Sequence, residues 1–435
     1  MTLRPGGFPE YNPGQQMIFD QIFEIIQKNY KQYGYTHIQT PAVEANKVLM
    51  SKNGEDAGKQ IFGLYGLAQG SEDTKDYALH FDLTVPFARY VLDRENEITF
   101  PFKRYQIQPA WRGERSQRGR FKELRQADID VIRNDSNPGD IGKNLFYDSE
   151  TLFVILKTLE AIKDRFLPGR KITMHINNRY LLSGFFSQFK GLDIQAMYSL
   201  VDKYYKIGQS KFEEELKTFN LSDLDYKKVI QFTQTKLEDL NIDLADNDVF
   251  NRGLKEIQEV MKNINLLNQS DGFSFVYDPF IIRGLDYYTG TVYETFFEDD
   301  MALGSISSGG RYENLTGYID PKKNFYSGVG GSIGLSRMVY LILETFKPEQ
   351  NTVADYLFLN FDGTFADIIA LANTFVKDGK NIEIYPDADK LGKQFGSADK
   401  KGIPYVVILG EGEKKEGIYK IKNMKTGEEE QIKIS

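Results

Sequence analysis

The sequence predicts an α+β fold followed by a small α/β domain, and three observations carry this prediction. Strand-like segments that also hold many charged residues dominate positions 77–133. Helix-forming segments rich in Lys and Glu replace them over about 179–270. Beyond about residue 350, strands alternate with helices, as in a small parallel α/β domain. We therefore expect an N-terminal domain with a helical insertion and a separate C-terminal domain.

The expected boundaries follow from the chain length and from one linker. A chain of 435 residues is too long for a single ordinary core, so two or three domains are expected. The stretch 347–352 contains proline and polar residues, as linkers do. We place the N-terminal domain at 1–350, with the insertion at about 179–270, and the C-terminal domain at 351–435.

The N-terminal domain is expected to begin with a helix and a short strand. Asn12 and Pro13 form an N-cap and a first helical position, and apolar residues follow at helical spacing as far as Gly34. Residues 36–39 are a strand candidate that leads into Pro41, because the residue before a proline favours extended backbone.

The charged strands come next, at 77–83, 102–111 and 124–133. In the last of them the residues alternate, with one face formed by Ala127, Ile129 and Val131 and the other by Gln126, Asp128 and Asp130. A polar row that points inward is typical of a ligand-binding strand. The strand alone leaves open the alternative that this row faces water.

The remaining elements complete both domains. In order, they are a helix at 147–166, a strand at 171–176, the helical insertion, strands at 273–282 and 291–297, then strands at 356–361, 381–385 and 404–409 alternating with helices at 365–376 and 390–400, and a hairpin at 418–434.

Composition narrows the chemistry. The chain has no cysteine, which excludes disulfides, thiolate nucleophiles and cysteine zinc sites. Its histidines, His37, His80 and His175, are scattered, so neither a histidine metal site nor a Ser-His relay is expected. The net charge of −8 argues against coating of nucleic acid by bulk charge, but it is compatible with a local basic surface for one RNA. No apolar run approaches the roughly 18 residues of a membrane span, and a cytoplasmic protein is expected.

The first candidate site is an Arg-rich hairpin that joins the strand ending at Trp111 to the alternating strand. It holds Arg112, Glu114, Arg115, Arg118, Arg120 and Arg125. Arginine is always charged and pairs bidentately with phosphate oxygens. A solvated charged loop is the alternative, but the polar row that follows favours phosphate binding.

The second candidate follows the apolar strand 273–282. Arg283 and Gly284 stand at the end of this strand, and Tyr287 and Tyr288 come directly after them. One charge and two hydroxyl groups at a strand end can converge on a small ligand. The alternative is a tight turn flanked by core aromatic residues.

The third candidate is a Gly-rich run at 327–338 that leads Arg337 into an apolar helix. Glycines allow the backbone to approach a flat ligand, and Arg337 could meet a phosphate group. Ile333 occupies the third glycine position of G-x-G-x-x-G, which disfavours a Rossmann dinucleotide site.

Taken in order, these segments resemble the three motifs of class II aminoacyl-tRNA synthetases. The matching stretches are Thr40-Pro41-Ala42-Val43-Glu44, Trp111-Arg112-Gly113-Glu114-Arg115 with Arg120-Phe121, and Gly330-Gly331-Ser332-Ile333-Gly334-Leu335-Ser336-Arg337. The peptide 283–290 looks like the signature of histidyl-tRNA synthetases, and 81–86 and 309–312 also resemble that family. The resemblance spans nearly the whole chain, and 351–435 looks like the family's anticodon-binding domain.

This resemblance implies a fold and an activity. The fold would be a six- or seven-stranded antiparallel sheet with an anticodon-binding domain, and the chain would form a homodimer through the first motif. The activity would be that of a histidine–tRNA ligase, which activates L-histidine with ATP and transfers it to tRNA(His). Mg²⁺ would accompany the pyrophosphate. A site built on buried hydrogen bonds rejects analogues by roughly 10⁴ to 10⁵, so no editing domain is expected.

The resemblance also assigns the ATP contacts. Arg112 would meet the α-phosphate, and Glu114 would lie near the adenine amino group. Phe121 would stack on the adenine ring, while Arg120 and Arg337 would point toward the β- and γ-phosphates.

By the same resemblance, the amino acid would be held by Asp82, Thr84, Arg112, Gln126, Asp130, Arg283, Tyr287 and Tyr288. Asp130 and the Tyr288 hydroxyl would take the two ring nitrogens of histidine. Asp82, Thr84 and Gln126 would hold the α-amino group. Arg283, with Arg112, would be catalytic by neutralising charge on the carboxylate and the α-phosphate, which is electrostatic rather than acid–base catalysis. No metal-ligand residue is expected.

Two further expectations concern RNA. Arg115 and Arg118, at the hairpin tip, are candidates for acceptor-stem contact, with plain solvent exposure as the alternative. Many relatives carry a closing helix where this chain ends after the hairpin 418–434, so a shortened C-terminal domain is expected.

Two other functions share part of the pattern. Synthetase-like subunits that modulate ATP phosphoribosyltransferase have the same catalytic fold, but they typically lack the signature residues and the anticodon domain. A synthetase for glycine, proline or threonine would share the three motifs but not the peptide 283–290.

Overall fold

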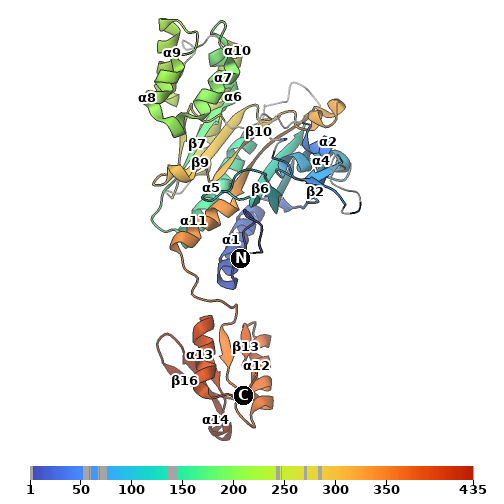
Figure 1. Cartoon of the computed structure of the whole chain (residues 1–435), viewed down its shortest axis with the longest axis vertical. Helices are drawn as coiled ribbons and strands as arrows, with labels where there is room; N and C mark the ends of the chain where they lie inside the picture. Colours follow the sequence, from blue (N-terminus) through green and yellow to red (C-terminus); the bar gives the residue numbers. More distant parts are fainter. Residues whose placement is uncertain are drawn as a thin grey trace. The chain divides into compact units, whose positions relative to one another are not determined.

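The computed structural model describes residues 3–51, 58, 60–66, 68, 76–135, 145–241, 245, 247–268, 272–282 and 287–434. The chain divides into two compact units, which are coloured along the sequence in Figure 1. One consists of Met1–Pro9 and Phe23–Thr345, and the other of Glu10–Ile22 and Phe346–Ser435. Each unit is described by itself.

The first unit is built on an eight-stranded sheet with the order β1-β5-β6-β11-β10-β9-β7-β8. Its strands are β1 (Thr36–His37), β5 (Phe102–Trp111), β6 (Glu123–Asn134), β7 (Ile172–Asn178), β8 (Ser274–Tyr277), β9 (Thr291–Phe297), β10 (Ser307–Tyr312) and β11 (Tyr326–Gly334). The six central strands pair antiparallel, whereas β1 with β5 and β7 with β8 pair parallel.

The expected six- or seven-stranded, wholly antiparallel sheet is therefore wrong in strand number and in both edges. The helical insertion separates β7 from β8, and a long crossover of this kind brings the chain back parallel to the strand it left. At the other edge, β1 is only two residues long, too short to show any alternation.

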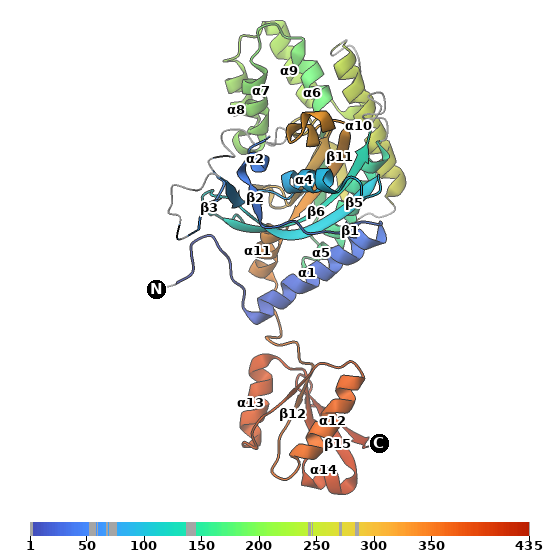
Figure 2. The ribbon, with the colours of Figure 1, turned by 90° about the vertical axis from the view of Figure 1, so that its right-hand side faces the viewer.

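Helices cover the apolar face of the sheet. The C-terminal part of α1 (Pro13–Gln32) lies along β5 and β6 (Figure 2). There Tyr30 packs edge-on against Tyr105 and donates to the Ala127 carbonyl oxygen at 3.3 Å. The long helix α5 (Phe146–Phe166) contacts β6, β10 and β11, and α11 (Leu335–Thr345) follows β11 and contacts β6. The opposite face of the central strands is left for a ligand.

Two smaller groups of elements flank this sheet. A three-stranded sheet, β2 (Val43–Ala45), β4 (Tyr77–Leu79) and β3 (Gly63–Leu64), lies with α2 (Asn46–Leu49) and α4 (Thr84–Arg94). The predicted insertion contains α6 (Arg179–Ser187), α7 (Ile194–Asp202), α8 (Tyr204–Leu216), α9 (Asp223–Gln234) and α10 (Asp248–Leu267). Short 3-10 helices are η3 (Leu237–Asp239), η5 (Met301–Leu303), η6 (Thr316–Tyr318) and η7 (Pro321–Lys323).

The second unit has a five-stranded sheet with the order β13-β12-β14-β15-β16. Its elements are β12 (Tyr356–Phe358), α12 (Phe365–Lys377), β13 (Ile382–Ile384), α13 (Leu391–Lys401), β14 (Tyr405–Ile408), α14 (Glu411–Glu416), β15 (Ile418–Asn423) and β16 (Glu429–Lys433). The first three strands along the chain are parallel, as the alternation predicts. Leu357 packs in one apolar cluster with Ala398 of α13, and Phe358 packs in another with Ile368 of α12.

Candidate active site

A cleft of about 820 Å³ opens on the polar face of the large sheet. All eleven of the site residues predicted from the sequence that the structure describes line it: Asp82, Thr84, Arg112, Glu114, Arg120, Phe121, Gln126, Asp130, Tyr287, Tyr288 and Arg337. They come from segments more than 250 residues apart in the sequence. The twelfth, Arg283, lies outside the described residues, as do its neighbours 284–286.

The alternating strand β6 forms the floor of the cleft. Gln126, Asp128 and Asp130 line the cleft and are nearly fully buried. The intervening Ala127 and Ile129 are fully buried, on the face covered by α1 and α5. The interpretation in which the polar row simply faces water is therefore excluded.

The Asp130 carboxylate has two buried polar partners, one on each oxygen. Arg104 of β5, paired across from it, places a guanidinium nitrogen 2.6 Å from its Oδ2, and the Tyr312 hydroxyl donates to its Oδ1 at 2.8 Å. A Cβ on Gly330, its neighbour on β11, would stand only 1.9 Å from that Oδ1, so only glycine fits there. Burial raises the pKa of Asp130 to about 7, although Arg104 and Tyr312 act in the opposite direction.

Two further carboxyl groups share this floor. Burial raises the pKa of Asp128 to about 6, and it also raises the pKa of Asp82. Asp82 precedes α4 and accepts a hydrogen bond from the Val85 backbone N–H at 3.1 Å, near the N-terminus of that helix. The Arg112 guanidinium lowers the pKa of both carboxyl groups, against the effect of burial. The floor is thus acidic and buried.

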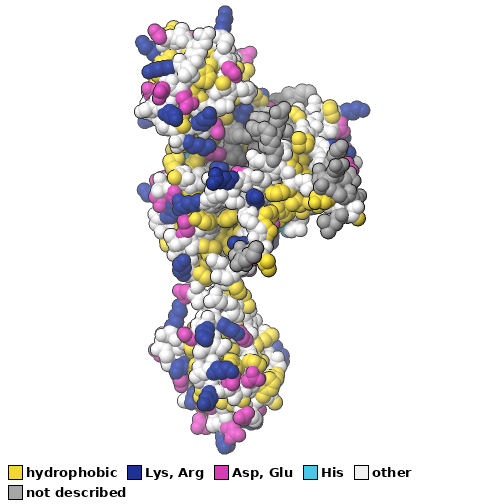
Figure 3. Space-filling view, in the orientation of Figure 1, with side chains coloured by type: hydrophobic (Ala, Val, Ile, Leu, Met, Phe, Trp, Pro, Cys, Tyr) yellow, Lys and Arg dark blue, Asp and Glu magenta, His cyan; other side chains and the backbone are white. Residues whose placement is uncertain are grey.

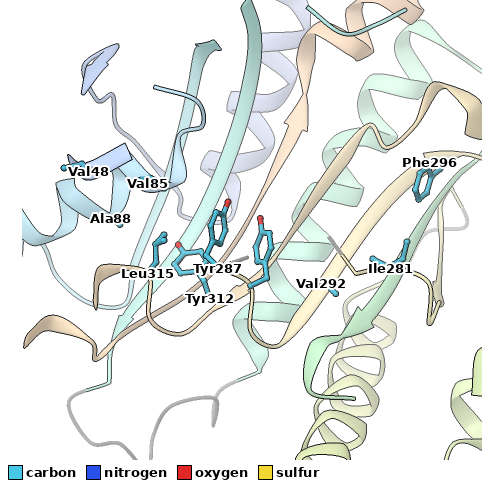
Figure 4. Close-up of a cluster of buried hydrophobic side chains, with 10 residues drawn as sticks. Val48, Val85, Ala88, Ile281, Tyr287, Val292, Phe296, Tyr312 and Leu315 are labelled. Atoms are coloured by element: carbon cyan, nitrogen blue, oxygen red, sulfur yellow. The ribbon is translucent and has the colours of Figure 1, made fainter. Parts of the chain in front are cut away.

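Three buried tyrosines form one wall. The ring centroids of Tyr287 and Tyr288 are 4.6 Å apart, and that of Tyr312 is 6.2 Å from Tyr287. Tyr287 and Tyr312 lie side by side in the buried cluster of Figure 4. Burial raises the pKa of Tyr287 well above its ordinary value, which keeps the phenol neutral. Tyr287 and Tyr288 thus lie in a buried aromatic cluster and also line the cleft, whereas the predicted turn before them lies outside the described residues.

The Arg-rich hairpin between β5 and β6 forms the other side of the cleft. Arg112 donates through Nε to the Phe81 carbonyl oxygen at 3.2 Å, and its guanidinium lies 4.5 Å from the centre of the Phe81 ring. Arg120 lies 3.8 Å from Glu114, and Phe121 is edge-on to Tyr340 of α11 with centroids 6.4 Å apart.

Arg337 is the most deeply placed arginine on this side. It follows β11, and its guanidinium donates to the Ser305 carbonyl oxygen. Burial, followed by repulsion from Arg120, lowers its pKa to about 10. A cation that is destabilised in this way gains from the arrival of an anion such as a phosphate.

The two arginines at the hairpin tip behave differently from the rest. Arg115 is exposed, and Arg118, which is half exposed, lies 2.8 Å from Glu344 and 3.3 Å from Asp300. Arg118 also lines the cleft. Arg115 is therefore solvent-exposed and Arg118 has acidic partners in this structure, and acceptor-stem contact stays a prediction for both.

Sequence reasoning missed Arg104 and did not assign a role to Asp128, and Tyr312 entered only within a family stretch. A usable signal was present, because Arg104 and Gln106 alternate on β5 just as the polar residues of β6 do, and both are fully buried. The register that sets Arg104 opposite Asp130 could not be read from either strand alone. Within the described residues, no three histidine, aspartate or glutamate side chains are grouped so that they could hold a metal ion.

Two family models match this chain. The model described as histidyl-tRNA synthetase matches residues 7–338, and the anticodon binding domain model matches residues 362–435. The chain belongs to the histidyl-tRNA synthetase family. Its catalytic scaffold is that of the class II synthetases, with the eight-stranded mixed sheet described above and a C-terminal α/β anticodon-binding domain.

Individual relatives agree with the family assignment. The chain is 36% identical to the histidine–tRNA ligase of Clostridium tetani, over 98% of this chain and 95% of the relative, and 35% identical to that of Finegoldia magna, over 99% and 96%. The crystal structure of histidyl-tRNA synthetase from Nostoc sp. PCC 7120 superposes with a TM-score of 0.87 at 33% identity, covering 100% of this chain and 97% of that one.

A more distant structure shares the fold alone. It is an ATP phosphoribosyltransferase regulatory subunit/histidyl-tRNA synthetase from Bacillus halodurans, with a TM-score of 0.73 at 18% identity. Among the helices that the structure describes, none is long and apolar enough to cross a membrane.

Proposed function

We propose that this chain is a histidine–tRNA ligase that joins L-histidine to tRNA(His) at the expense of ATP. The observation that carries the proposal is the shared cleft, which combines an acidic, buried floor with a wall of arginines. An amino acid with a cationic amino group suits the floor, and a polyphosphate suits the arginines. The described residues that line the cleft include no cysteine and no histidine.

The arginine side binds ATP in this proposal. Arg112 contacts the α-phosphate, while Arg120 and Arg337 approach the β- and γ-phosphates. The depressed pKa of Arg337 supports this assignment, because the incoming negative charge relieves the unfavourable burial of its cation. Phe121 stacks on adenine, and Glu114 accepts from the adenine amino group.

The acidic side binds histidine. The imidazole ring presents one donor and one acceptor nitrogen when it is neutral. Asp130 and the Tyr288 hydroxyl meet these two nitrogens, with Tyr287 supporting Tyr288 at a ring distance of 4.6 Å. Asp82, Thr84 and Gln126 hold the α-amino group. The ion pair with Arg104 keeps Asp130 oriented for this contact.

The reaction itself needs placement and charge neutralisation. The histidine carboxylate attacks the α-phosphorus of ATP, the bond to the β-phosphate oxygen breaks, and pyrophosphate leaves. Arg112 and Arg283 offset the negative charge that gathers on the carboxylate and the α-phosphate during this step. The terminal ribose hydroxyl of the tRNA then attacks the carbonyl carbon of histidyl-adenylate, and AMP leaves.

Mg²⁺ enters this scheme with the nucleotide. Mg²⁺ keeps several waters and binds through one or two carboxylates together with substrate phosphates. Glu294, which lines the cleft near Arg337, is the candidate protein ligand of such a shared site. When bound, the ion would stabilise negative charge on the departing pyrophosphate.

The tRNA engages both domains in this proposal. The catalytic domain, 1–350, receives the acceptor end, with Arg115 and Arg118 as contact candidates, and the domain 351–435 reads the unstacked anticodon bases. The enzyme acts in the cytoplasm as a homodimer formed through the first motif.

The test is direct charging of tRNA. Purified chain, ATP, Mg²⁺ and labelled histidine should yield labelled tRNA(His), with no label when ATP is left out. Glycine, proline and threonine, offered with their own tRNAs, serve as the matched alternatives. Charging with one of these three, and none with histidine, would refute the proposal.

A further inference from the structure

Three side-chain oxygens on the floor of the cleft stand out. Asp82 Oδ2, Gln126 Oε1 and Asp128 Oδ1 are buried, and none has a hydrogen-bond partner within the part of the chain that the structure describes. A buried acceptor without a partner costs about 1–3 kcal/mol, and a charged one costs more. Three such acceptors around one cleft indicate a ligand that is rich in N–H donors.

Ser332 sets the direction of the Gln126 amide. Gln126 donates through Nε2 to the Ser332 hydroxyl oxygen at 2.9 Å, which turns Oε1 of the same amide away from Ser332. Ser332 also lies opposite Asp128 in the β6–β11 ladder, and its hydroxyl group lowers the pKa of that carboxyl group. Asp128 Oδ1 still has no hydrogen-bond partner among the described residues.

The charges of the floor are also incomplete. Asp82, Asp128 and Asp130 are all buried there, but the fully buried Arg104 forms its ion pair with Asp130. Within the described residues, neither Asp82 nor Asp128 forms an ion pair, and each raises the cost of ionising its neighbour, as the effect of Asp82 on the pKa of Asp128 shows. A ligand that brings one positive charge would balance this excess.

We propose that Asp128 is a further substrate-binding residue, whose carboxylate joins the side-chain oxygens of Asp82 and Gln126 in a three-oxygen cradle for the α-ammonium group of histidine. An ammonium group has three N–H donors, and the cradle offers three acceptors. The assignment rests on the proposed function. It adds the residue midway between Gln126 and Asp130 on the same face of β6.

The cradle makes histidine binding dependent on pH. Burial raises the pKa of Asp128 to about 6, so a growing fraction of this group is protonated as the pH falls below that value. A protonated carboxyl group attracts an ammonium group only weakly. Several groups surround the Asp128 carboxylate: Asp82 from the segment before α4, Asp130 from β6, Arg104 and Gln106 from β5, Arg112 from the hairpin and Ser332 from β11.

The test uses Asp128→Asn in the full chain and measures histidine-dependent ATP–pyrophosphate exchange. Because a charge-assisted hydrogen bond contributes about 1.5–3 kcal/mol, we expect the KM for histidine to rise about ten- to hundredfold, while the KM for ATP changes less than about twofold. The rise of the wild-type KM for histidine below pH 6 should be flatter in the variant.

Two inhibitors make the ammonium contact specific. L-histidinol keeps the ammonium group and the ring but lacks the carboxylate, and 3-(imidazol-4-yl)propionate lacks the ammonium group. Asp128→Asn should weaken histidinol inhibition by the same factor as the KM for histidine and leave inhibition by the propionate unchanged. Equal weakening of both inhibitors, or of neither, would overturn the role of Asp128.

The matched control is Asp135→Asn. Asp135 is a buried aspartate just after β6 that does not line the cleft, so its substitution should leave the KM for histidine unchanged. A similar KM rise in this control would count against a cradle. If the wild type shows histidine-dependent exchange and Asp128→Asn has the same KM for histidine, only the proposal for Asp128 is rejected. If the wild type shows no exchange with histidine, the proposed function is rejected as well.

Discussion

Asp128 is a residue at which fold stability and substrate binding are expected to oppose each other. Its folded pKa of about 6 lies above the ordinary value of 3.8. Between these two values the folded state holds a proton that the unfolded state has released. Stability therefore falls as the pH rises through this window, and it stays lower above pH 6.

The first prediction follows from this sign. At pH 8, the free energy of unfolding of Asp128→Asn should exceed that of wild type by an amount on the order of 1–3 kcal/mol, because each pKa unit corresponds to about 1.4 kcal/mol. The variant should therefore unfold at a higher temperature. The difference should shrink toward zero at pH 4, where both proteins are uncharged at this position. Thermal unfolding of the free proteins at both pH values checks it, and a variant that is less stable at pH 8 would show that Asp128 holds the fold together.

The sequence predicts which residues share a face of the sheet where apolar and polar residues alternate along a strand. The alternation at 124–133 placed Gln126 and Asp130 on one face, and the structure puts both in the cleft. The contacts of Asp130 with Arg104 and Tyr312 were not predictable, because they cross strands that lie about 26 and 182 positions away and depend on the register of the sheet.

At the scale of elements, β11 decides how close the backbone comes to the site. Gly330 faces Asp130, and a Cβ on the next residue, Gly331, would collide with the Tyr293 hydroxyl and lie close to Ile155 of α5. A side chain on Gly330 or on Gly331 would displace a neighbouring side chain. The two collisions lie on opposite faces of the sheet, because successive strand residues alternate between the faces. Packing on both faces of the sheet therefore requires glycine at these two positions of the Gly-rich run.

The second prediction compares two glycines of this strand. Alanine at Gly330 would place its Cβ 1.9 Å from Asp130 Oδ1 and 2.8 Å from the Ile129 carbonyl oxygen, whereas the nearest atom to a Cβ at Gly334 is 3.6 Å away. Gly330→Ala should cost about 1–3 kcal/mol of stability and raise the KM for histidine at least about tenfold. Gly334→Ala, the control, should leave the KM for histidine near wild type; chemical denaturation and exchange kinetics would report any failure of this contrast.

The sheet itself was predictable only in its long strands. β5 and β6, with 10 and 12 residues, are long enough for their charged, alternating pattern to show. β1, with two residues, and β8, which pairs parallel after the insertion, carry no period that reveals a partner. Strand number and direction at the edges therefore came from the structure.

At the scale of the whole molecule, the two units have separate cores. In the second unit, α12 and α13 bury apolar clusters of their own. Acidic and basic side chains are interspersed over the face of this unit seen in Figure 3. This face therefore has no continuous positively charged surface that would attract RNA by bulk charge. Specific contacts to unstacked bases fit such a surface better.

The third prediction separates the two half-reactions. Removal of 351–435 should leave histidine-dependent exchange within about threefold of the full chain, because every described cleft residue lies before that point. Charging of tRNA(His) should fall by about a hundredfold or more, the equivalent of about 3 kcal/mol of lost contact energy. Loss of exchange in a truncated chain that keeps its native circular dichroism would contradict the proposed division of labour.

For the whole chain, the sequence predicts the domain organisation and the absence of thiol chemistry, but its residue pattern alone does not identify the amino acid substrate. The lack of cysteine excludes thiol chemistry, the scattered histidines make a histidine metal site unexpected, and the linker at 347–352 predicts where the α/β domain begins. The identity of the amino acid came from the resemblance of 283–290 and from the family comparison, since an acidic floor and a set of arginines would suit other amino acids and ATP as well.

The central claim is that the cleft activates histidine and no other amino acid. ATP–pyrophosphate exchange, measured on the full chain with each of the twenty amino acids in turn, tests it most directly. We predict exchange with L-histidine and none above background with the other nineteen. Exchange driven by a different amino acid, with none driven by histidine, would contradict the account.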